Sequence, residues 1–149
     1  MIWDANKTYA LLLLPLVVGI GFFFFLKQEK AVPETIVRIG DREWLVETVA
    51  SPESRAKGLS DRDTLCPDCA MLFRFDTEGT YGFWMKDMRF PIDIAWIREG
   101  KIVHVERHVP ADFSGVMTPE ESADTVLETN AGDLDEVPTG AEVIVQENL

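Results

Sequence analysis

The sequence is poor in the residues that build metal centres. Its 149 residues include two cysteines, Cys66 and Cys69, and two histidines, His104 and His108. A zinc site needs about four ligands, and two positions four residues apart in a strand are separated by ~13 Å, so both histidines cannot reach one ion. No phosphate-binding glycine loop and no nucleophile–base pair is visible either. We therefore predict no metal site and no cofactor.

Positive charge is also scarce. From Ala31 onward there are 11 basic and 24 acidic residues, a net charge of −13, and no Lys or Arg follows Arg107. Such a surface repels phosphate backbones, which disfavours binding of nucleic acid. Solubility is the simplest explanation for this charge, and binding of a cation or a basic partner is the alternative.

The N-terminal segment has the opposite character. Residues Tyr9 to Leu26 form an uncharged run of 18 residues, long enough for a helix of ~27 Å that spans the hydrocarbon core of a bilayer. A cleaved signal peptide is the alternative, but its apolar region is usually only ~7–15 residues and is followed by a small-residue cleavage site. The run predicts one transmembrane helix, with residues 1–30 as membrane anchor and linker.

The tail before this helix is short, and one larger domain follows it. This arrangement fits a signal anchor that holds residues 31–149 outside the cytoplasm at the cell membrane, although the Lys and Arg counts of the two flanks nearly tie. The remaining 119 or so residues are enough for one domain and too few for two.

Short β-type runs dominate residues 31–149. Residues 35–39 and 43–49 flank Gly40-Asp41, and residues 92–97 and 101–106 flank Arg98-Glu99-Gly100, so each pair predicts a hairpin. Further strands are predicted at residues 70–75, 81–86, 124–129 and 142–145. Many short strands indicate an all-β domain, which we predict to be a compact antiparallel β-sandwich.

One short helix is predicted between the second and third strands. Ser51 is a preferred N-cap residue and Pro52 suits the first helical position. The helix is expected to reach about Lys57 and to stop at Gly58.

Five motifs in a fixed order carry a family resemblance. They are Arg55-x-x-Gly58-Leu59-Ser60-x-Arg62, Met71-Leu72-Phe73-x-Phe75, Phe83-Trp84-Met85-Lys86, Pro91-Ile92-Asp93-Ile94, and Val126-Leu127-Glu128 with Ala131-Gly132. Together they resemble domain of unknown function 192 (DUF192). The resemblance implies a compact, jelly-roll-like β-sandwich that is often secreted or membrane-anchored, and it implies no activity. The sequence departs from the family pattern at Ala70, where Gly is usual, and at Asp87, where Asn is usual.

Cys66-Pro67-Asp68-Cys69 is the first candidate for chemistry. A redox pair usually begins a helix, whereas here a strand follows and acidic residues surround the motif, which raises the thiol pKa. We favour a local disulfide, and free thiols, a redox role and a metal half-site are the alternatives.

A set of polar residues is the second candidate. Trp84 and Lys86 share one face of a predicted strand. If the strands stack as the motifs suggest, five side chains converge on one ligand cleft: Arg55, Trp84, Lys86, Asp93 and Glu128. The cleft would suit a polar small ligand, a glycan or a peptide. The alternative is that Trp84 belongs to the core and that Lys86 and Asp93 form a structural ion pair.

These observations favour a membrane-anchored, extracytoplasmic binding or accessory module of the cell envelope, whose other partner is the membrane through residues 9–26. The competing class is a hydrolase of envelope polymers with Asp93 and Glu128 as its carboxylates. A structure decides between them by showing whether these two carboxylates face a common cleft.

Overall fold

The computed structural model describes residues 35–147. They belong to a compact unit that runs from Ala31 to Leu149. The predicted membrane helix at residues 9–26 lies outside the described residues. Between residues 35 and 147, no helix is both long and apolar enough to cross a membrane.

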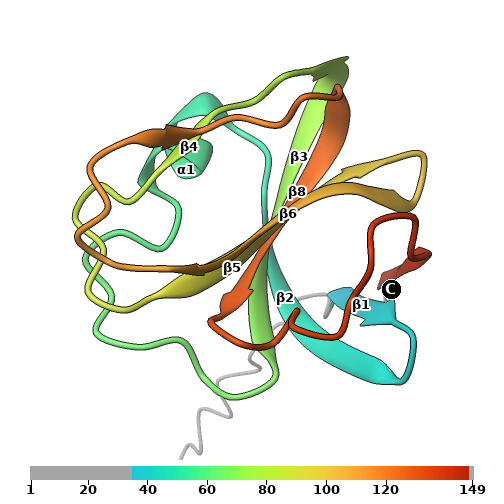
Figure 1. The fold of residues 1–149 in the computed structure, drawn as a ribbon, viewed down its shortest axis with the longest axis horizontal. Helices are drawn as coiled ribbons and strands as arrows, with labels where there is room; N and C mark the ends of the chain where they lie inside the picture. The colour runs from blue at the N-terminus through green and yellow to red at the C-terminus, as the bar shows by residue number, and fades with distance from the viewer. Residues whose placement is uncertain (1–34, 148–149) are drawn as a thin grey trace, which may run out of the picture. The chain divides into compact units, whose positions relative to one another are not determined.

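The described residues form nine strands and one helix, an all-β arrangement apart from that helix. Seven of the strands build one sheet in the order β6-β5-β8-β3-β2-β1-β9, and β4 pairs with β7 in a separate ribbon of two strands (Figure 1). In chain order the elements are β1 (Thr35–Ile39), β2 (Arg42–Val49), α1 (Pro52–Lys57), β3 (Cys69–Gly79), β4 (Phe83–Trp84), β5 (Ile92–Arg98), β6 (Lys101–Val109), β7 (Val116–Met117), β8 (Ala123–Asn130) and β9 (Val143–Glu147).

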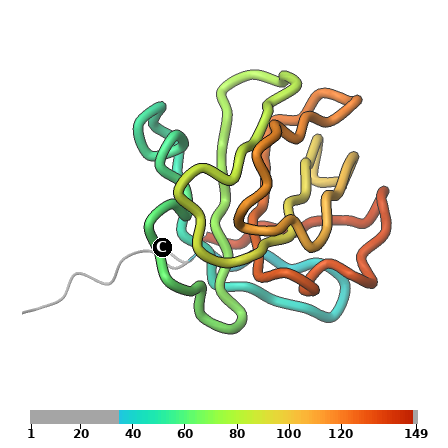
Figure 2. The backbone as a smooth tube through the Cα atoms, turned by 60° about the vertical axis from the view of Figure 1, so that its left-hand side comes forward, coloured from blue at the N-terminus to red at the C-terminus, as the bar shows by residue number. Residues whose placement is uncertain are grey.

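The seven-stranded sheet curls toward closure (Figure 2). The backbone N–H of Ile102 on β6 donates to the carbonyl of Ala141 over 3.0 Å, and Val143 N–H donates to the carbonyl of Gly100 over 2.8 Å. The edge strand β6 thus contacts the segment that leads into β9, the strand at the other edge of the sheet. This arrangement limits the unpaired backbone that edge strands expose. In place of the predicted β-sandwich, seven strands form one curled sheet, and β4 and β7 pair separately from it.

Both predicted hairpins are present. β1 pairs with β2 and β5 pairs with β6, each antiparallel. The expectation of an antiparallel sheet fails at one place, since β2 and β3 run parallel. Parallel neighbours require a crossover connection, and here the crossover is the segment 50–68, which contains α1.

The helix forms as its sequence predicts. Ser51 caps it by accepting a hydrogen bond from Ser54 N–H over 3.1 Å, and Pro52 occupies the first turn. Gly58 ends it with φ of +50°, a conformation that favours glycine. Its position also brings Gly58 against the ring of Phe73, so the crossover packs closely on β3.

Alternating side chains give the sheet a core on each face. Ala95 and Leu127 belong to one cluster, whereas Ile94 and Val126, their sequence neighbours, belong to the other. We call these the Leu127 face and the Val126 face. The crossover lies over the Val126 face, where Leu59 is almost fully buried in the second cluster.

Candidate functional site

A pocket of about 200 Å³ opens between the crossover and the Val126 face. One wall comes from the end of α1 and the residues that follow it, and the other comes from β3 and the chain around β4. Its lining residues are Arg55, Ala56, Lys57, Gly58, Leu59, Ser60, Phe73, Phe75, Tyr81, Gly82, Phe83, Trp84, Met88 and Glu128.

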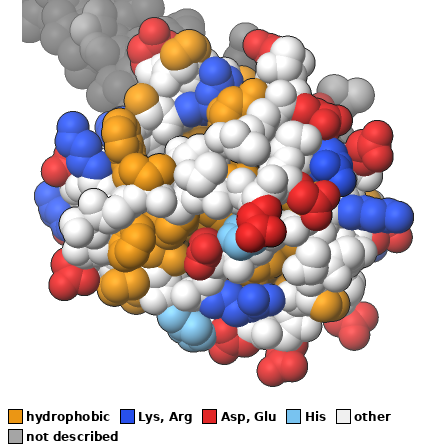
Figure 3. Space-filling view, turned by 45° about the horizontal axis from the view of Figure 1, so that its top comes forward, with side chains coloured by type: hydrophobic (Ala, Val, Ile, Leu, Met, Phe, Trp, Pro, Cys, Tyr) orange, Lys and Arg blue, Asp and Glu red, His pale blue; other side chains and the backbone are white. Residues whose placement is uncertain are grey.

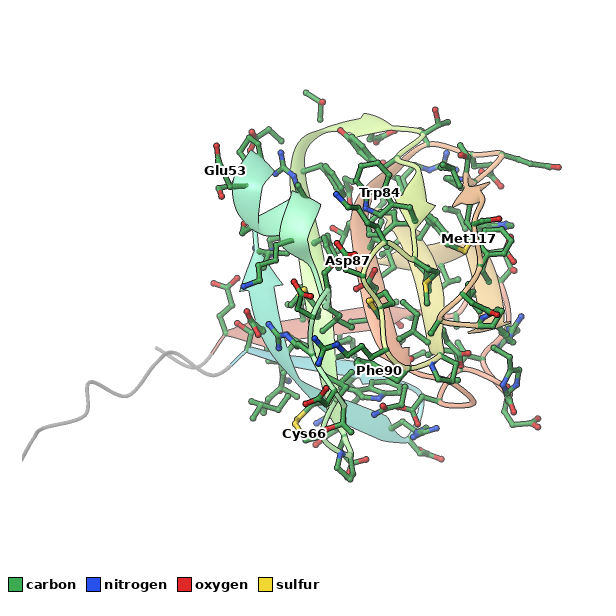
Figure 4. All side chains as sticks on the ribbon, turned by 90° about the vertical axis from the view of Figure 1, so that its left-hand side faces the viewer. Glu53, Cys66, Trp84, Asp87, Phe90 and Met117 are labelled. Atoms are coloured by element: carbon green, nitrogen blue, oxygen red, sulfur yellow. A yellow bond between two sulfur atoms is a disulfide. The ribbon has the colours of Figure 1, made fainter. Side chains whose placement is uncertain are left out.

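Aromatic side chains shape the pocket. Phe75 and Tyr81 stack with their ring centroids 3.5 Å apart, and Phe83 meets Phe73 edge to face at 4.9 Å. Trp84 is 55% exposed although the rings around it are more buried. In Figure 4, Trp84 lies between α1, which carries Glu53, and the strand that carries Met117. An exposed indole beside an aromatic pocket is suited to contact a ligand.

Two hydrogen bonds fix the crossover to the segment after β4. Ser60 Oγ donates to the carbonyl of Lys86 over 2.8 Å, and Asp61 N–H donates to the carbonyl of Asp87, also over 2.8 Å. Asp87 has φ of +56°. Asn and Asp tolerate this conformation better than other non-glycine residues, so Asp87 can replace Asn at this turn for backbone reasons.

Glu128 lies on the pocket side of β8, the strand between β5 and β3. Its neighbours across the two strand pairs are Ile94 and Met71, both almost fully buried. Glu128 is itself only 5% exposed. Its Oε2 atom is buried and has no hydrogen-bond partner among the described residues.

The surroundings of Glu128 favour its neutral form. Removal from water raises the pKa of this carboxyl group to about 8, and the positive charge of Arg62 opposes this rise only in part. Arg62 is engaged elsewhere, with Glu47 at 2.8 Å. At neutral pH Glu128 is therefore mostly protonated and can donate as well as accept a hydrogen bond.

Arg55 reaches the same pocket from α1. Its guanidinium group donates to the carbonyl of Arg74 over 2.9 Å and to the carbonyl of Ala50, and it lies 4.8 Å above the ring of Phe75. These contacts make Arg55 a fixed positive part of the pocket rim. The structure thus brings together three of the five predicted cleft residues: Arg55, Trp84 and Glu128.

Asp93 does not join them, which corrects the prediction. Its side chain is fully buried, and its oxygens accept hydrogen bonds from the backbone N–H groups of His108 at 2.7 Å, Gly132 at 2.9 Å and Leu134 at 2.9 Å. This carboxylate links β5 to two other chain segments. The evident role of Asp93 is structural.

Lys86 is also absent from this pocket. Its side chain is exposed, and it lines a separate hollow of about 290 Å³ with Trp84, Phe113 and Val116. The alternative of a structural ion pair between Lys86 and Asp93 is wrong, because the side chain of Lys86 is exposed whereas that of Asp93 is fully buried and accepts three backbone hydrogen bonds.

Several pocket residues were missed from the sequence. Ser60, Phe75, Tyr81, Phe83 and Met88 line the pocket, although the sequence analysis did not include them in the ligand cleft. The Gly58-Leu59-Ser60 motif was the available signal for this wall of the pocket. Gly58 packs against Phe73 of β3, and the residues that follow it line the pocket.

Cys66 and Cys69 form a disulfide with their Cα atoms 5.3 Å apart. In Figure 4, Cys66 lies at the opposite end of the domain from Trp84. The side-chain amide of Asn130 donates to the carbonyl of Cys66 over 3.1 Å, which ties this bridge to the end of β8. The two cysteines therefore have a structural role and do not line the pocket.

Ligand chemistry at other places is limited. Among residues 35–147, no group of three or more His, Cys, Asp or Glu side chains could hold a metal ion. Figure 3 shows hydrophobic side chains gathered on one part of the surface, with acidic side chains both at the margin and near the centre of that view.

The family model DUF192, described as an uncharacterized ACR, matches residues 35–145. The chain belongs to the DUF192 family. Among curated proteins none matches it.

Two solved structures share the fold of this DUF192 protein. A proposed transcription regulator from Sinorhizobium meliloti 1021 is 25% identical, with a TM-score of 0.69 over 76% of this chain and 92% of that one. A protein of unknown function from Novosphingobium aromaticivorans DSM 12444 is 20% identical, also with a TM-score of 0.69, over 74% of this chain and 83% of that one. The second likeness concerns the fold alone.

Proposed function

We propose that this protein is a membrane-tethered binding module of the cell envelope that holds a small ligand in the pocket above Glu128. The buried Oε2 of Glu128, which has no hydrogen-bond partner between residues 35 and 147, carries this proposal. A buried polar atom without a hydrogen bond costs about 1–3 kcal/mol. Groups kept at such a cost are typical of binding and active sites.

The shape of the pocket supports a ligand of modest size. Its walls are mostly aromatic and aliphatic, with a single carboxyl group at the base and Arg55 at the rim. Many apolar contacts around a few fixed polar groups are the usual composition of a small-molecule site.

The competing hydrolase receives less support. Glycoside cleavage uses two carboxyl groups on one cleft, separated by about 5–9.5 Å according to the mechanism. Asp93 faces the other side of the sheet and is occupied by three backbone N–H groups. Among the residues that line the pocket, Glu128 is the only acid. Binding is the function that this arrangement favours.

Other features support a location outside the cytoplasm. The uncharged run at residues 9–26 would anchor the chain in the membrane. A disulfide between Cys66 and Cys69 is compatible with an oxidising compartment. A role in transcription, proposed for the Sinorhizobium protein, is disfavoured here by the net charge of −13 from Ala31 onward.

A pocket-blocking variant tests the binding function. Ala56 is exposed on α1 and lines the pocket, so Ala56→Trp should fill the mouth without disturbing the core. Glu53→Trp places the same side chain on the same helix at a position that does not line the pocket. It is the matched control.

The full-length chain in detergent should be screened against glycans, cell-wall peptides and a fragment library by ligand-observed NMR. At least one compound should bind the wild type and Glu53→Trp and lose most of its binding to Ala56→Trp. Trp84→Ala should weaken binding of the same compound, because the exposed indole lies at the mouth of the pocket. Compounds that bind all four proteins equally would show that the pocket is not the site.

A further inference from the structure

The chemistry of the pocket base narrows the class of ligand. We propose that Glu128 recognises an uncharged amide edge, of a primary amide or a lactam, carried by a flat apolar ring. This inference rests on the proposed binding function, because it names the ligand of the same pocket. It is argued from three properties of the pocket: the hydrogen bonds that Glu128 can make, the poor fit of charged ligands, and the aromatic side chains of the walls.

A protonated carboxyl group presents one donor and one acceptor side by side. A primary amide or a lactam presents the complementary pair, a carbonyl oxygen and an N–H on one edge. Such a ligand would offer one donor and one acceptor to the carboxyl group of Glu128, whose buried Oε2 has no hydrogen-bond partner in the described part of the chain. No charge is buried in the process, so the desolvation cost stays small.

A cationic ligand fits less well. An ammonium group would require Glu128 to ionise between Ile94 and Met71, where the carboxylate has no hydrogen-bond donor for Oε2 within the described part of the chain. It would also have to pass two basic residues of the pocket lining, Arg55 and Lys57.

An anionic ligand fits less well for another reason. A carboxylate can accept the proton of Glu128 but offers no donor to the second oxygen. Arg55 holds the carbonyls of Ala50 and Arg74 through Nη1 alone, so its other N–H groups could meet an anion, but none of them donates to the buried oxygen of Glu128. An anion would therefore leave the carboxyl group of Glu128 only partly satisfied.

The flat ring follows from the walls. The stacked rings of Phe75 and Tyr81 and the edge-to-face pair of Phe73 and Phe83 leave planar faces and edges around the space. Offset stacking and edge-to-face contacts between aromatic groups add to the gain from burial alone. Trp84 at the mouth offers a further indole face.

Three probes on one phenyl ring separate the possibilities. Benzamide is the neutral amide, benzylamine the cation and benzoate the anion. Their dissociation constants should be measured by ligand-observed NMR with the full-length chain in detergent at pH 6.5, and the Ala56→Trp variant provides the correction for partitioning into micelles. Benzamide should bind at least about tenfold more tightly than the other two, a difference that one or two hydrogen bonds can supply.

Two substitutions at Glu128 complete the test. Glu128→Gln keeps a donor and an acceptor, so benzamide should still bind within about threefold of the wild type. Glu128→Met fills the same space without hydrogen bonds, so binding should fall at least about tenfold. Circular dichroism of both variants confirms that the sheet is intact.

Proton coupling supplies an independent readout. If benzamide binds only when Glu128 is protonated, its apparent dissociation constant should rise about tenfold between pH 7 and pH 9 in the wild type. In Glu128→Gln the same constant should stay flat over this range. The comparison removes any general effect of pH on the protein.

The failures of the two proposals are distinguishable. Tighter binding of benzylamine or benzoate, equal binding of benzamide to Glu128→Met, or no binding of any probe at ~10 mM would overturn the amide inference. Each of these results leaves the binding function open to support from the wider screen. If every compound in that screen bound Ala56→Trp as tightly as the wild type, both proposals would fail.

Discussion

Asp93 and Glu128 lie on adjacent strands and point to opposite faces of one sheet. Asp93 on β5 is aligned with Thr129 on β8, so its neighbour in register is one residue beyond Glu128, which is aligned with Ile94. A shift of one residue reverses the direction of a side chain in a strand. The two buried carboxyl groups therefore have different surroundings. Asp93 accepts three backbone hydrogen bonds, and the buried oxygen of Glu128 accepts none in the described part of the domain.

Removal of the Asp93 carboxylate should destabilise the domain. Asp93→Ala leaves the backbone N–H groups of His108, Gly132 and Leu134 without their acceptor, and we expect a loss of roughly 3–5 kcal/mol in the free energy of unfolding. Asp112→Ala is the control at an exposed position and should change stability by less than ~0.5 kcal/mol. Urea denaturation followed by circular dichroism measures both. A loss below about 1 kcal/mol for Asp93→Ala would contradict the structural role.

Glu128 should behave in the opposite way. Glu128→Met replaces a carboxyl group that is almost fully buried by a side chain of similar length without polar oxygen atoms. We expect unchanged or increased stability at pH 7, because groups that serve binding are often retained at some cost to folding. A decrease of more than ~2 kcal/mol by urea denaturation would mean that Glu128 supports the fold and would weaken its assignment to a ligand site.

The stability of the wild type should depend on pH through Glu128. Its pKa is raised by burial to about 8 in the folded domain from an ordinary value of 4.5, so the folded state holds a proton that the unfolded state releases above pH 4.5. Stability therefore falls as the pH rises from about 4.5 to about 8 and levels off above that, by at most on the order of 5 kcal/mol.

Glu128→Gln cannot titrate and isolates this effect. The difference in unfolding free energy between the wild type and Glu128→Gln should shift in favour of the variant as the pH increases from 5 to 8. Parallel urea denaturation series at several pH values measure it. Parallel pH profiles for the two proteins would show that Glu128 has an ordinary pKa in the folded domain.

The disulfide should contribute little to stability. Cys66 and Cys69 are three positions apart, and the chain-entropy model gives about 2 kcal/mol or less for so short a loop. Replacing both residues by Ser should therefore lower the melting temperature only modestly, and thiol alkylation of the wild type should require prior reduction. Because Cys66 lies at the opposite end of the domain from Trp84, ligand binding should be unchanged (Figure 4). Stoichiometric zinc in purified protein would contradict this assignment.

The N-terminal run should keep the full-length chain in the membrane pellet through high-salt and alkaline washes, because residues 9–26 carry no charge and are long enough to span a bilayer. A chain that begins at Ala31 should remain in solution under the same conditions. N-terminal sequencing of the mature protein provides the decisive check. A first residue after Leu26 would identify the run as a cleaved signal peptide.

Local signals in the sequence predicted local structure well. The turn residues at Gly40-Asp41 and Glu99-Gly100 predicted two hairpins, and the Ser51-Pro52 pair predicted the start of α1. The pairing of β2 with β3 could not be predicted in this way, because it depends on a crossover that brings distant segments together. The sequence thus indicated strands and hairpins but not the curl of the sheet.

The candidate site shows the same contrast between local structure, which the sequence predicts, and the pairing of distant strands, which it does not. Arg55, Trp84 and Glu128 were grouped correctly because they belong to motifs that fold onto one face. Lys86 and Asp93 would join them only if the chain around β4 stacked beside β5 in one sheet. β4 instead pairs with β7, through Phe83 aligned with Met117 and Trp84 with Val116. Periodicity gives the alternation of side chains along a strand, but the partner strand decides what each side chain meets.

The parallel pair of β2 and β3 has an evolutionary consequence. Its crossover, residues 50–68, supplies one wall of the pocket, whereas the sheet supplies the base with Glu128. The free energy of closing a connecting segment changes slowly with its length, so insertions or replacements there are tolerated better than a change of strand register. Relatives could therefore acquire different ligand preferences by altering this one connection while the seven-stranded sheet is inherited unchanged.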